Sequence, residues 1–265
     1  MDKASVGGVL LGLVGIVGGL LLEGGTVSQI VQPTAAMIVF GGTAGAILVQ
    51  FPLSVVLTAV GRLAGIFFQP PASLESVIEQ LVTYANLARR RGIASLDDEL
   101  PNVKDPFMKK VLTLAVDGTE PQELRKIAEL ELDNELEREE RFPQVFESAG
   151  GFSPTVGIIG AVLGLIQVMQ HLDKLDEVGR GIAVAFVATI YGVGAANLLL
   201  LPVAGKLRIR LREEQARKEM VLEGVIAILG GMNPRMLRNS LLSFVGEPVG
   251  EPEEITIARA AGAGA

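Results

Sequence analysis

Four long stretches of this chain carry no charged side chain, and they constrain the fold more than any other feature. They cover residues 4–22, 34–50, 152–170 and 181–205. Each stretch has roughly the 17–25 residues that a helix needs to cross the hydrocarbon core of a bilayer. In lipid, only helices and closed barrels pair all of their backbone polar groups, and these stretches do not alternate as barrel strands do. We therefore predict an all-α membrane protein with four transmembrane helices in two hairpins.

Composition supports a membrane protein. Of the 265 residues, 49% are hydrophobic and 20% are charged, which is too apolar for one soluble core. Lys3 is the only basic residue before the first apolar stretch, and Glu23-Gly24-Gly25 follows it rather than a small-residue cleavage site. We therefore expect a retained helix rather than a signal peptide. The absence of cysteine excludes disulfides and Cys-ligated metals, and the net charge of −7 argues against nucleic-acid binding.

Lysine and arginine are distributed unevenly between the segments that join the apolar stretches. Residues 51–151 carry eleven of them and residues 203–265 carry nine, whereas the segment 23–33 has none and the segment 171–180 has two. The positive-inside rule then places both large polar segments and both termini in the cytoplasm.

This orientation gives five predicted regions. They are a transmembrane hairpin (1–50), a cytoplasmic helical domain (51–151), a second transmembrane hairpin (152–205), cytoplasmic C-terminal helices (206–245) and a disordered tail (246–265).

Cap and turn residues indicate where the cytoplasmic helices begin and end. Pro70-Pro71 are expected to end the exit from the second span, and Pro143 is expected to kink the long helix that leads into the third. The expected starts are Ser73, Asp105-Pro106, a Thr119/Gln122 capping box and Asn233-Pro234, and the expected ends are Gly92, Gly118 and Gly230-Gly231.

The chain lacks the residues of a catalytic or metal site. Its single histidine, His171, cannot form a cluster, and no glycine-rich nucleotide motif is complete. We expect no enzymatic activity, no cofactor and no metal. The interiors of the four apolar stretches contain no Asp, Glu, Lys, Arg or His, although a cation path through a membrane normally requires an ionisable group. If the chain conducts ions, a partner should supply the carboxylate.

Small residues recur at four-residue spacing in every apolar stretch. Helices in lipid associate through such small faces, because the hydrophobic effect contributes little to helix–helix association inside a bilayer. For the first two stretches, with Gly8, Gly12 and Gly41 among others, we favour packing within one chain, although a larger assembly also fits.

Two prolines flank the second hairpin: Pro154 could mark a helix boundary, whereas Pro202 interrupts a helix that continues into KLRIRL and predicts a kink or hinge.

Several stretches together resemble the MotA family of flagellar stator subunits. They are FSPTVGIIGAVLGLIQVM, GIAVAFVATIYGVGAANLLLLPVAGKL, LARRRGIASLDDEL, FMKKVLTLAVDG and VLEGVIAILGGMNPRML. The resemblance covers about residues 1–245. It implies five copies around two MotB-like chains in the bacterial inner membrane, with membrane lipid around them. In this arrangement the partner's transmembrane Asp carries the ion and the ring turns against the rotor protein FliG.

The resemblance also assigns roles to residues. The ion path would be lined by the third and fourth spans, with Pro154 and Pro202 as the functional prolines, Thr155 at the mouth and Thr189 facing the pore. Ala161 stands where sodium-type relatives carry a threonine, which favours protons because sodium needs several oxygen ligands. Arg89 and Asp97 match the rotor-facing charges best, with Arg90 and Asp98 as close alternatives; without the resemblance, a solvated helix end would be the preferred interpretation.

Two further functions remain open at this point. A TolQ/ExbB-like energiser of another envelope system shares the last two spans but lacks the hairpin that precedes the cytoplasmic domain. A self-sufficient channel or transporter is disfavoured by the uncharged spans.

Overall fold

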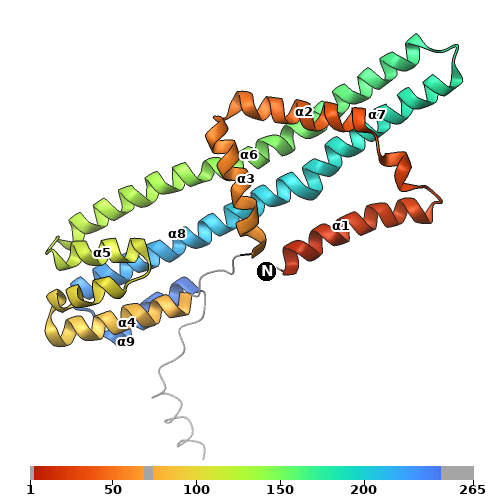
Figure 1. Ribbon diagram of the computed structural model, residues 1–265. Helices are drawn as coiled ribbons and strands as arrows, with labels where there is room; N and C mark the ends of the chain where they lie inside the picture. Colours follow the sequence, from red (N-terminus) through yellow and green to blue (C-terminus); the bar gives the residue numbers. More distant parts are fainter. Residues whose placement is uncertain (1–2, 69–73, 246–265) are drawn as a thin grey trace, which may run out of the picture. The chain divides into compact units, whose positions relative to one another are not determined.

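The computed structural model describes residues 3–68 and 74–245, and all regular structure in these residues is helical (Figure 1). Four helices there are long and apolar enough to cross a membrane, and they contain the four stretches expected from the sequence. The helices are α1 (Lys3–Leu22), α2 (Pro33–Gln50), α3 (Leu53–Phe68), α4 (Leu74–Arg91), α5 (Pro106–Val116), α6 (Pro121–Gln170), α7 (Leu175–Ala195), α8 (Leu201–Leu229) and α9 (Pro234–Leu242). Shorter turns are η1 (Val27–Ile30), η2 (Ile93–Asn102), η3 (Ala196–Leu200) and η4 (Ser243–Val245).

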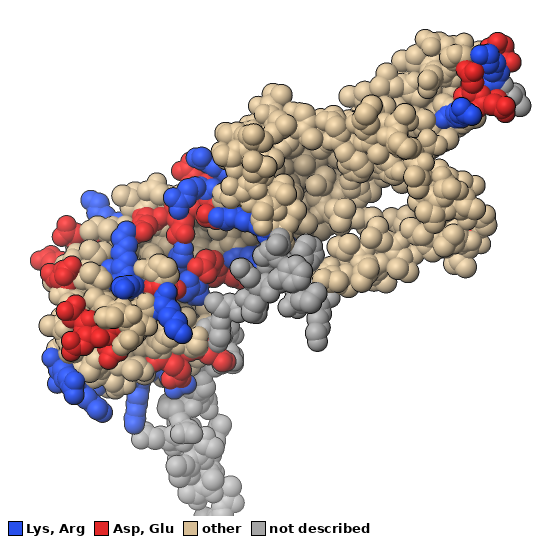
Figure 2. All heavy atoms as spheres, in the orientation of Figure 1, with Lys and Arg blue, Asp and Glu red and all other residues tan. Residues whose placement is uncertain are grey.

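The chain divides into two compact units. The first comprises residues 1–71 and 137–211, and the second comprises residues 72–136 and 212–265. In Figure 2 the part of the first unit that contains α1, α2 and the hairpin of α6 and α7 shows charged side chains only near the loop between α6 and α7, whereas ion pairs such as Arg62–Glu139 and Arg208–Glu147 lie in the rest of the unit. Large apolar side chains such as Leu11, Val49 and Phe186 are exposed there, as expected for helices that face lipid or other membrane helices.

The second unit has a conventional apolar core. Side chains of α4, α5, α6 and α8 bury one another, with Leu81, Met108, Leu124 and Met220 fully inaccessible. The helix α9 adds Leu237 to this core.

The exit from the second span differs from the expectation. The helix α2 ends at Gln50, and α3 begins at Leu53, directly after Pro52. Proline favours an extended residue before it, and Phe51 adopts φ −122° and ψ 145°. The carbonyl of Pro52 accepts bonds from the amides of Val55 and Val56, so the proline opens the next helix. Residues 70, 71 and 73 lie outside the described residues, as does the tail from residue 246.

The predicted end of α5 at Gly118 is confirmed, but the predicted start of α6 at Thr119 is wrong. Gly118 has φ +84°, and its amide donates to the carbonyl of Ala115 while the amide of Thr119 donates to the carbonyl of Leu114. This pair of bonds terminates a helix. Thr119 therefore completes the end of α5, and α6 begins two residues later at Pro121. The predicted ends at Gly92 and Gly231, with φ +85° and +71°, and the cap at Asn233 are confirmed.

The loop between α6 and α7 is shorter than predicted. The helix α7 begins at Leu175, so only residues 171–174 connect it to α6. Asp176 and Glu177 lie in its first turn, where the helix dipole favours negative charge. Asp176 and Glu177 are therefore helical where the sequence predicts a polar loop.

Candidate functional site: the glycine seam and the exposed cytoplasmic charges

The third and fourth spans meet along a line of small residues, here called the glycine seam. A Cβ added to Gly164 would lie 2.7 Å from the carbonyl oxygen of Gly181, and one added to Gly160 would lie 2.8 Å from the Cβ of Ala188. A Cβ added to Gly192 would lie 2.5 Å from the carbonyl oxygen of Ser153. These distances leave no room for a methyl group, so α6 and α7 are in direct backbone contact. The seam comprises Gly157, Gly160 and Gly164 of α6 with Gly181, Ala185, Ala188 and Gly192 of α7.

The glycines of the first two spans behave differently. In the described part of the chain, a Cβ added at Gly8, Gly15, Gly41 or Gly45 would meet no atom within 4 Å. Gly12 is an exception in α1, since its added Cβ would lie 3.2 Å from Leu198. The expectation that these glycines serve packing within one chain is therefore wrong for most of them. Spacing identifies a small face but does not identify its partner.

Pro154 lies inside a continuous helix and does not mark a boundary. The helix α6 runs from Pro121 through Pro143 and Pro154 to Gln170. The Cα of Pro154 would lie 3.2 Å from a Cβ at Gly192, so the proline sits against the seam. Because proline has no amide hydrogen, Pro154 leaves the carbonyl of Gly150 without its helical donor. The neighbouring hydroxyl of Ser153 is fully buried and has no hydrogen-bond partner among the described residues.

Pro202 is accommodated by a π-helical turn. The turn spans five residues, Ala196–Leu200, and the amide of Leu201 donates to the carbonyl of Ala196, five residues back. A proline removes one helical donor and crowds the preceding turn, and a π-turn is a common way for a helix to absorb such an irregularity. The predicted interruption is confirmed in position, and the helix then continues as α8. Leu201 packs on α6, with its Cδ2 2.6 Å from where a Cβ of Gly150 would be.

The predicted ion-path hydroxyls bond to their own helices. Thr155 is exposed and donates to the carbonyl of Phe152 at 2.7 Å. Thr189 is half-buried and donates to the carbonyl of Ala185 at 3.2 Å. Ala161 is half-buried and offers only a methyl group. Each threonine keeps lone pairs that can accept a bond from water or a partner.

Tyr191 has a structural role that the sequence did not indicate. Its hydroxyl donates to the carbonyl of Ile30 at 2.6 Å and accepts from the amide of Gln32 at 3.2 Å. Its ring stacks on Phe40 with centroids 5.9 Å apart. Tyr191 thus fixes the start of α2 to the last turns of α7. Its partners lie about 160 residues away, so no local pattern could reveal them.

In the second unit, the expected rotor-facing charges lie on the surface. Arg89 and Arg90 belong to the last turn of α4, where the helix dipole favours cations. Asp97 and Asp98 follow in η2, which is held by the buried side chains of Leu96 and Leu100. Among the described residues, none of these four charges forms an ion pair.

Other charges of the same unit are paired. Asp105 caps α5 by accepting from the amide of Met108 at 2.8 Å, and it forms an ion pair with Arg217. Arg217 also donates to Glu214 at 2.6 Å and 3.0 Å. Burial raises the pKa of Asp105, but the hydrogen bond from the backbone amide of Met108 and the guanidinium of Arg217 outweigh burial. Together they hold the pKa of Asp105 below its ordinary value.

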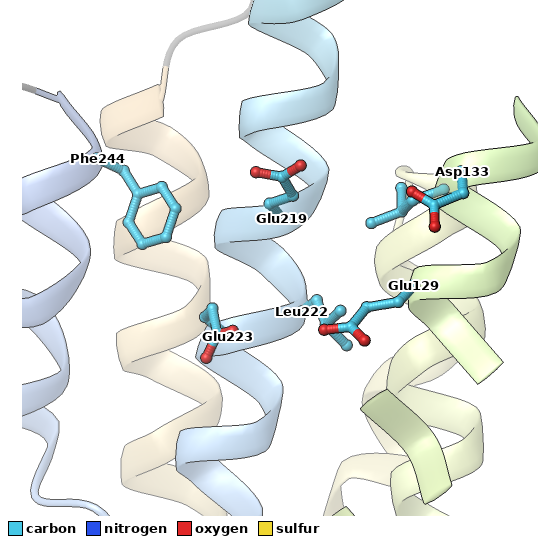
Figure 3. Close-up of a pocket in the computed structure, with 7 residues that line it drawn as sticks. Glu129, Asp133, Glu219, Leu222, Glu223 and Phe244 are labelled. Atoms are coloured by element: carbon cyan, nitrogen blue, oxygen red, sulfur yellow. The ribbon is translucent and has the colours of Figure 1, made fainter. Parts of the chain in front are cut away.

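An acidic cavity of about 370 Å³ lies between α6, α8 and η4 (Figure 3). Its carboxylates are Glu129 and Asp133 of α6 and Glu219 and Glu223 of α8, and Leu132, Leu222 and Phe244 complete the lining. Arg125 neutralises part of this charge, since it donates to Glu223 at 2.8 Å and lies 3.4 Å from Glu129. Across the described ranges, no group of three or more His, Asp or Glu side chains is arranged to hold a metal.

Comparison with known proteins decides the family. Residues 99–220 match the MotA/TolQ/ExbB proton channel family, and residues 6–92 match the motility protein A N-terminal family. The chain is 34% identical over 247 residues to Motility protein A of Bacillus subtilis, covering 92% of this chain and 91% of that protein. The chain belongs to the MotA family.

Solved structures of MotA-type complexes have the same fold. The C. jejuni MotAB structure has a TM-score of 0.88 at 27% identity, covering 95% of this chain and 98% of that one. The flagellar MotAB stator complex from Bacillus subtilis has a TM-score of 0.84 at 32% identity, covering 91% and 96%. Membership of the MotA family confirms the resemblance seen in the sequence and the expectation that the chain is not an enzyme.

Proposed function

We propose that this chain is a stator subunit of the bacterial flagellar motor. With a MotB-like partner it forms an ion channel whose flux turns a rotor. The observation that carries the proposal is similarity along nearly the whole chain, first hairpin included, to motility protein A. The match to the motility protein A N-terminal family favours this function over a TolQ/ExbB-like energiser, which lacks that hairpin.

The partner's carboxylate is the second element of the proposal. The interiors of the spans contain no Asp, Glu, Lys, Arg or His, and the hydroxyls of Thr155 and Thr189 already donate to their own helices. A transmembrane Asp on the MotB-like chain would carry the ion past Thr155 and Thr189, in a ring of five copies of this chain in the inner membrane. Each unit charge that crosses 100 mV releases about 2.3 kcal/mol.

Co-expression with the cognate partner tests this proposal. The two chains should co-purify, and liposomes that contain the complex should acidify in response to a proton gradient. Replacing the partner's transmembrane Asp by Asn should abolish the flux while leaving the complex intact. Equal flux from this chain alone would show that it is a self-sufficient channel and would refute the proposal.

We propose protons as the coupling ion because Ala161 contributes a methyl group where a sodium path would need oxygen. Motility should therefore persist in sodium-free medium and collapse with a protonophore. Swimming speed that rises and saturates with sodium at constant proton-motive force would contradict this assignment.

For the orientation, we propose cytoplasmic termini with η1 and the α6–α7 loop outside the cell. The absence of native cysteine allows single-cysteine labelling without background. Thr26→Cys and Asp173→Cys, both at exposed positions, should react with an impermeant thiol reagent added to intact cells, and Gln80→Cys should react only after permeabilisation. The opposite pattern would invert the topology.

For the rotor contact, we propose the exposed charges at the end of α4 and in η2, which would meet FliG. Their exposure and their lack of ion pairs in the described residues leave them available to a partner. Exposed ion pairs contribute only about 0–1 kcal/mol each. Single neutralisation of Arg89 or Asp97 should therefore be mild, whereas reversal of Arg89, Arg90 and Arg91 together should stop swimming without loss of the membrane complex. Normal swimming of the triple variant would exclude this surface.

A further inference from the structure

A groove in the first unit separates α1 from η3 and the start of α8. It has a volume of about 350 Å³ and is lined by the N-terminal half of α1, including Ser5, Gly8 and Val9, and by Asn197, Pro202 and Lys206. Small-molecule sites in proteins span about 300–1,000 Å³. Leu198 lies 3.2 Å from where a Cβ of Gly12 would be, and no atom lies within 4 Å of a Cβ added at Gly8. In Figure 1, α1 runs apart from the other helices over most of its length.

Polar groups are distributed unevenly in this groove. Most of the lining is aliphatic, while Lys206 stands at the end of the span, where the uncharged stretch stops. Lys206 opens a run of four cations in seven residues, Lys206, Arg208, Arg210 and Arg212. Arg208 forms an ion pair with Glu147 at 2.6 Å, and Arg210 follows Lys206 by one helical turn on the same face.

An aliphatic groove inside a membrane with a cationic end fits one class of ligand. The acyl chain of a phospholipid would fill the apolar part, and its phosphate would lie beside Lys206 and Arg210. Basic residues directly after a span and basic pockets between spans are the usual sites for anionic lipid headgroups. We propose that this groove binds an anionic phospholipid, one per chain, whose acyl chain packs against Pro202. The inference requires only that the spans are inserted in a membrane, and it does not depend on rotor contact or on the identity of the ion.

The test uses the complex purified with its partner in mild detergent and stripped of lipid. Phosphatidylglycerol or phosphatidylethanolamine is titrated back, and bound lipid is counted by native mass spectrometry. The wild type should retain phosphatidylglycerol in preference to phosphatidylethanolamine. Lys206→Gln should reduce that preference about fivefold, which corresponds to about 1 kcal/mol for one charge near the membrane surface. Gly8→Leu should fill the groove and reduce retention of both lipids.

Two control variants separate the groove from general effects. Gly15→Leu adds the same side chain to α1 at another position with no atom nearby, and Lys126→Gln removes an exposed lysine of α6 in the second unit. Both should bind lipid as the wild type does. Equal retention of the two lipids, or unchanged retention in Gly8→Leu and Lys206→Gln, would overturn the proposal. A disulfide between Gly8→Cys on one copy and Leu199→Cys on another would also overturn it, because a neighbouring chain would then occupy the groove.

Discussion

The glycine seam predicts a large difference between two glycines of the same helix that are two residues apart. A Cβ at Gly192 would lie 2.5 Å from the carbonyl oxygen of Ser153, 3.1 Å from the Cα of Gly157 and 3.2 Å from the Cα of Pro154. All three are backbone atoms and cannot move aside as a side chain can. Overpacking of this kind costs about 1–3 kcal/mol. Gly192→Ala should therefore destabilise the packing of α7 on α6 by that amount.

Gly194→Ala is the matched control, because a Cβ at Gly194 would meet no atom within 4 Å. The same methyl group is added to the same helix, so effects on helix propensity are shared by the two variants. The assay is unfolding of the purified complex in mixed micelles with increasing dodecyl sulfate, followed by far-ultraviolet circular dichroism. The midpoint should fall for Gly192→Ala and stay near the wild-type value for Gly194→Ala. Equal midpoints for the two variants would refute the close contact of α6 and α7.

Three further predictions concern single side chains. Asp105→Asn keeps a cap for α5 but removes a charged partner of Arg217, so hydrogen exchange of the α5 amides should report a loss of stability of about 1.5–3 kcal/mol at neutral pH. Because the pKa of Asp105 is lowered in the folded state, this loss should be full above the unfolded pKa of about 3.9 and should vanish as the pH falls through the folded-state pKa. A loss that does not depend on pH would contradict the ion pair. Tyr191→Phe keeps the ring on Phe40 but removes both hydrogen bonds, so protease cleavage in η1 should increase while the complex stays assembled, and unchanged cleavage would mean that the hydroxyl does not fix α2. Pro202→Ala restores a helical donor next to η3 and should lower swimming speed at a normal amount of membrane complex, whereas loss of the complex would show that the proline serves assembly.

Features that depend on local composition could be predicted from the sequence. The four spans follow from uncharged length, and the ends at Gly92, Gly118 and Gly231 follow from positions where only glycine adopts positive φ easily. The sequence marks α3 only weakly as a separate helix, because its apolar residues continue those of the second span and Pro52 alone separates the two.

Features that depend on partners distant in sequence could not be predicted. The same four-residue glycine spacing occurs in α1, where it meets almost nothing, and in α6, where it meets the backbone of α7. The role of Tyr191 depends on Ile30 and Gln32, and the pairing of Asp105 with Arg217 joins residues 112 positions apart. Proline at 202 predicted an interruption, but only the structure shows that a π-turn absorbs it.

The glycine seam also has a mechanical consequence. Where two helices touch through backbone atoms, no side chain can change rotamer between them, so the contact is stiff. The hairpin of α6 and α7 should therefore transmit force as one body along the length of the seam. The compliance of the span is then concentrated beyond Gly192, in the wide turn of η3 before Pro202, where backbone bonds already depart from the regular helical pattern.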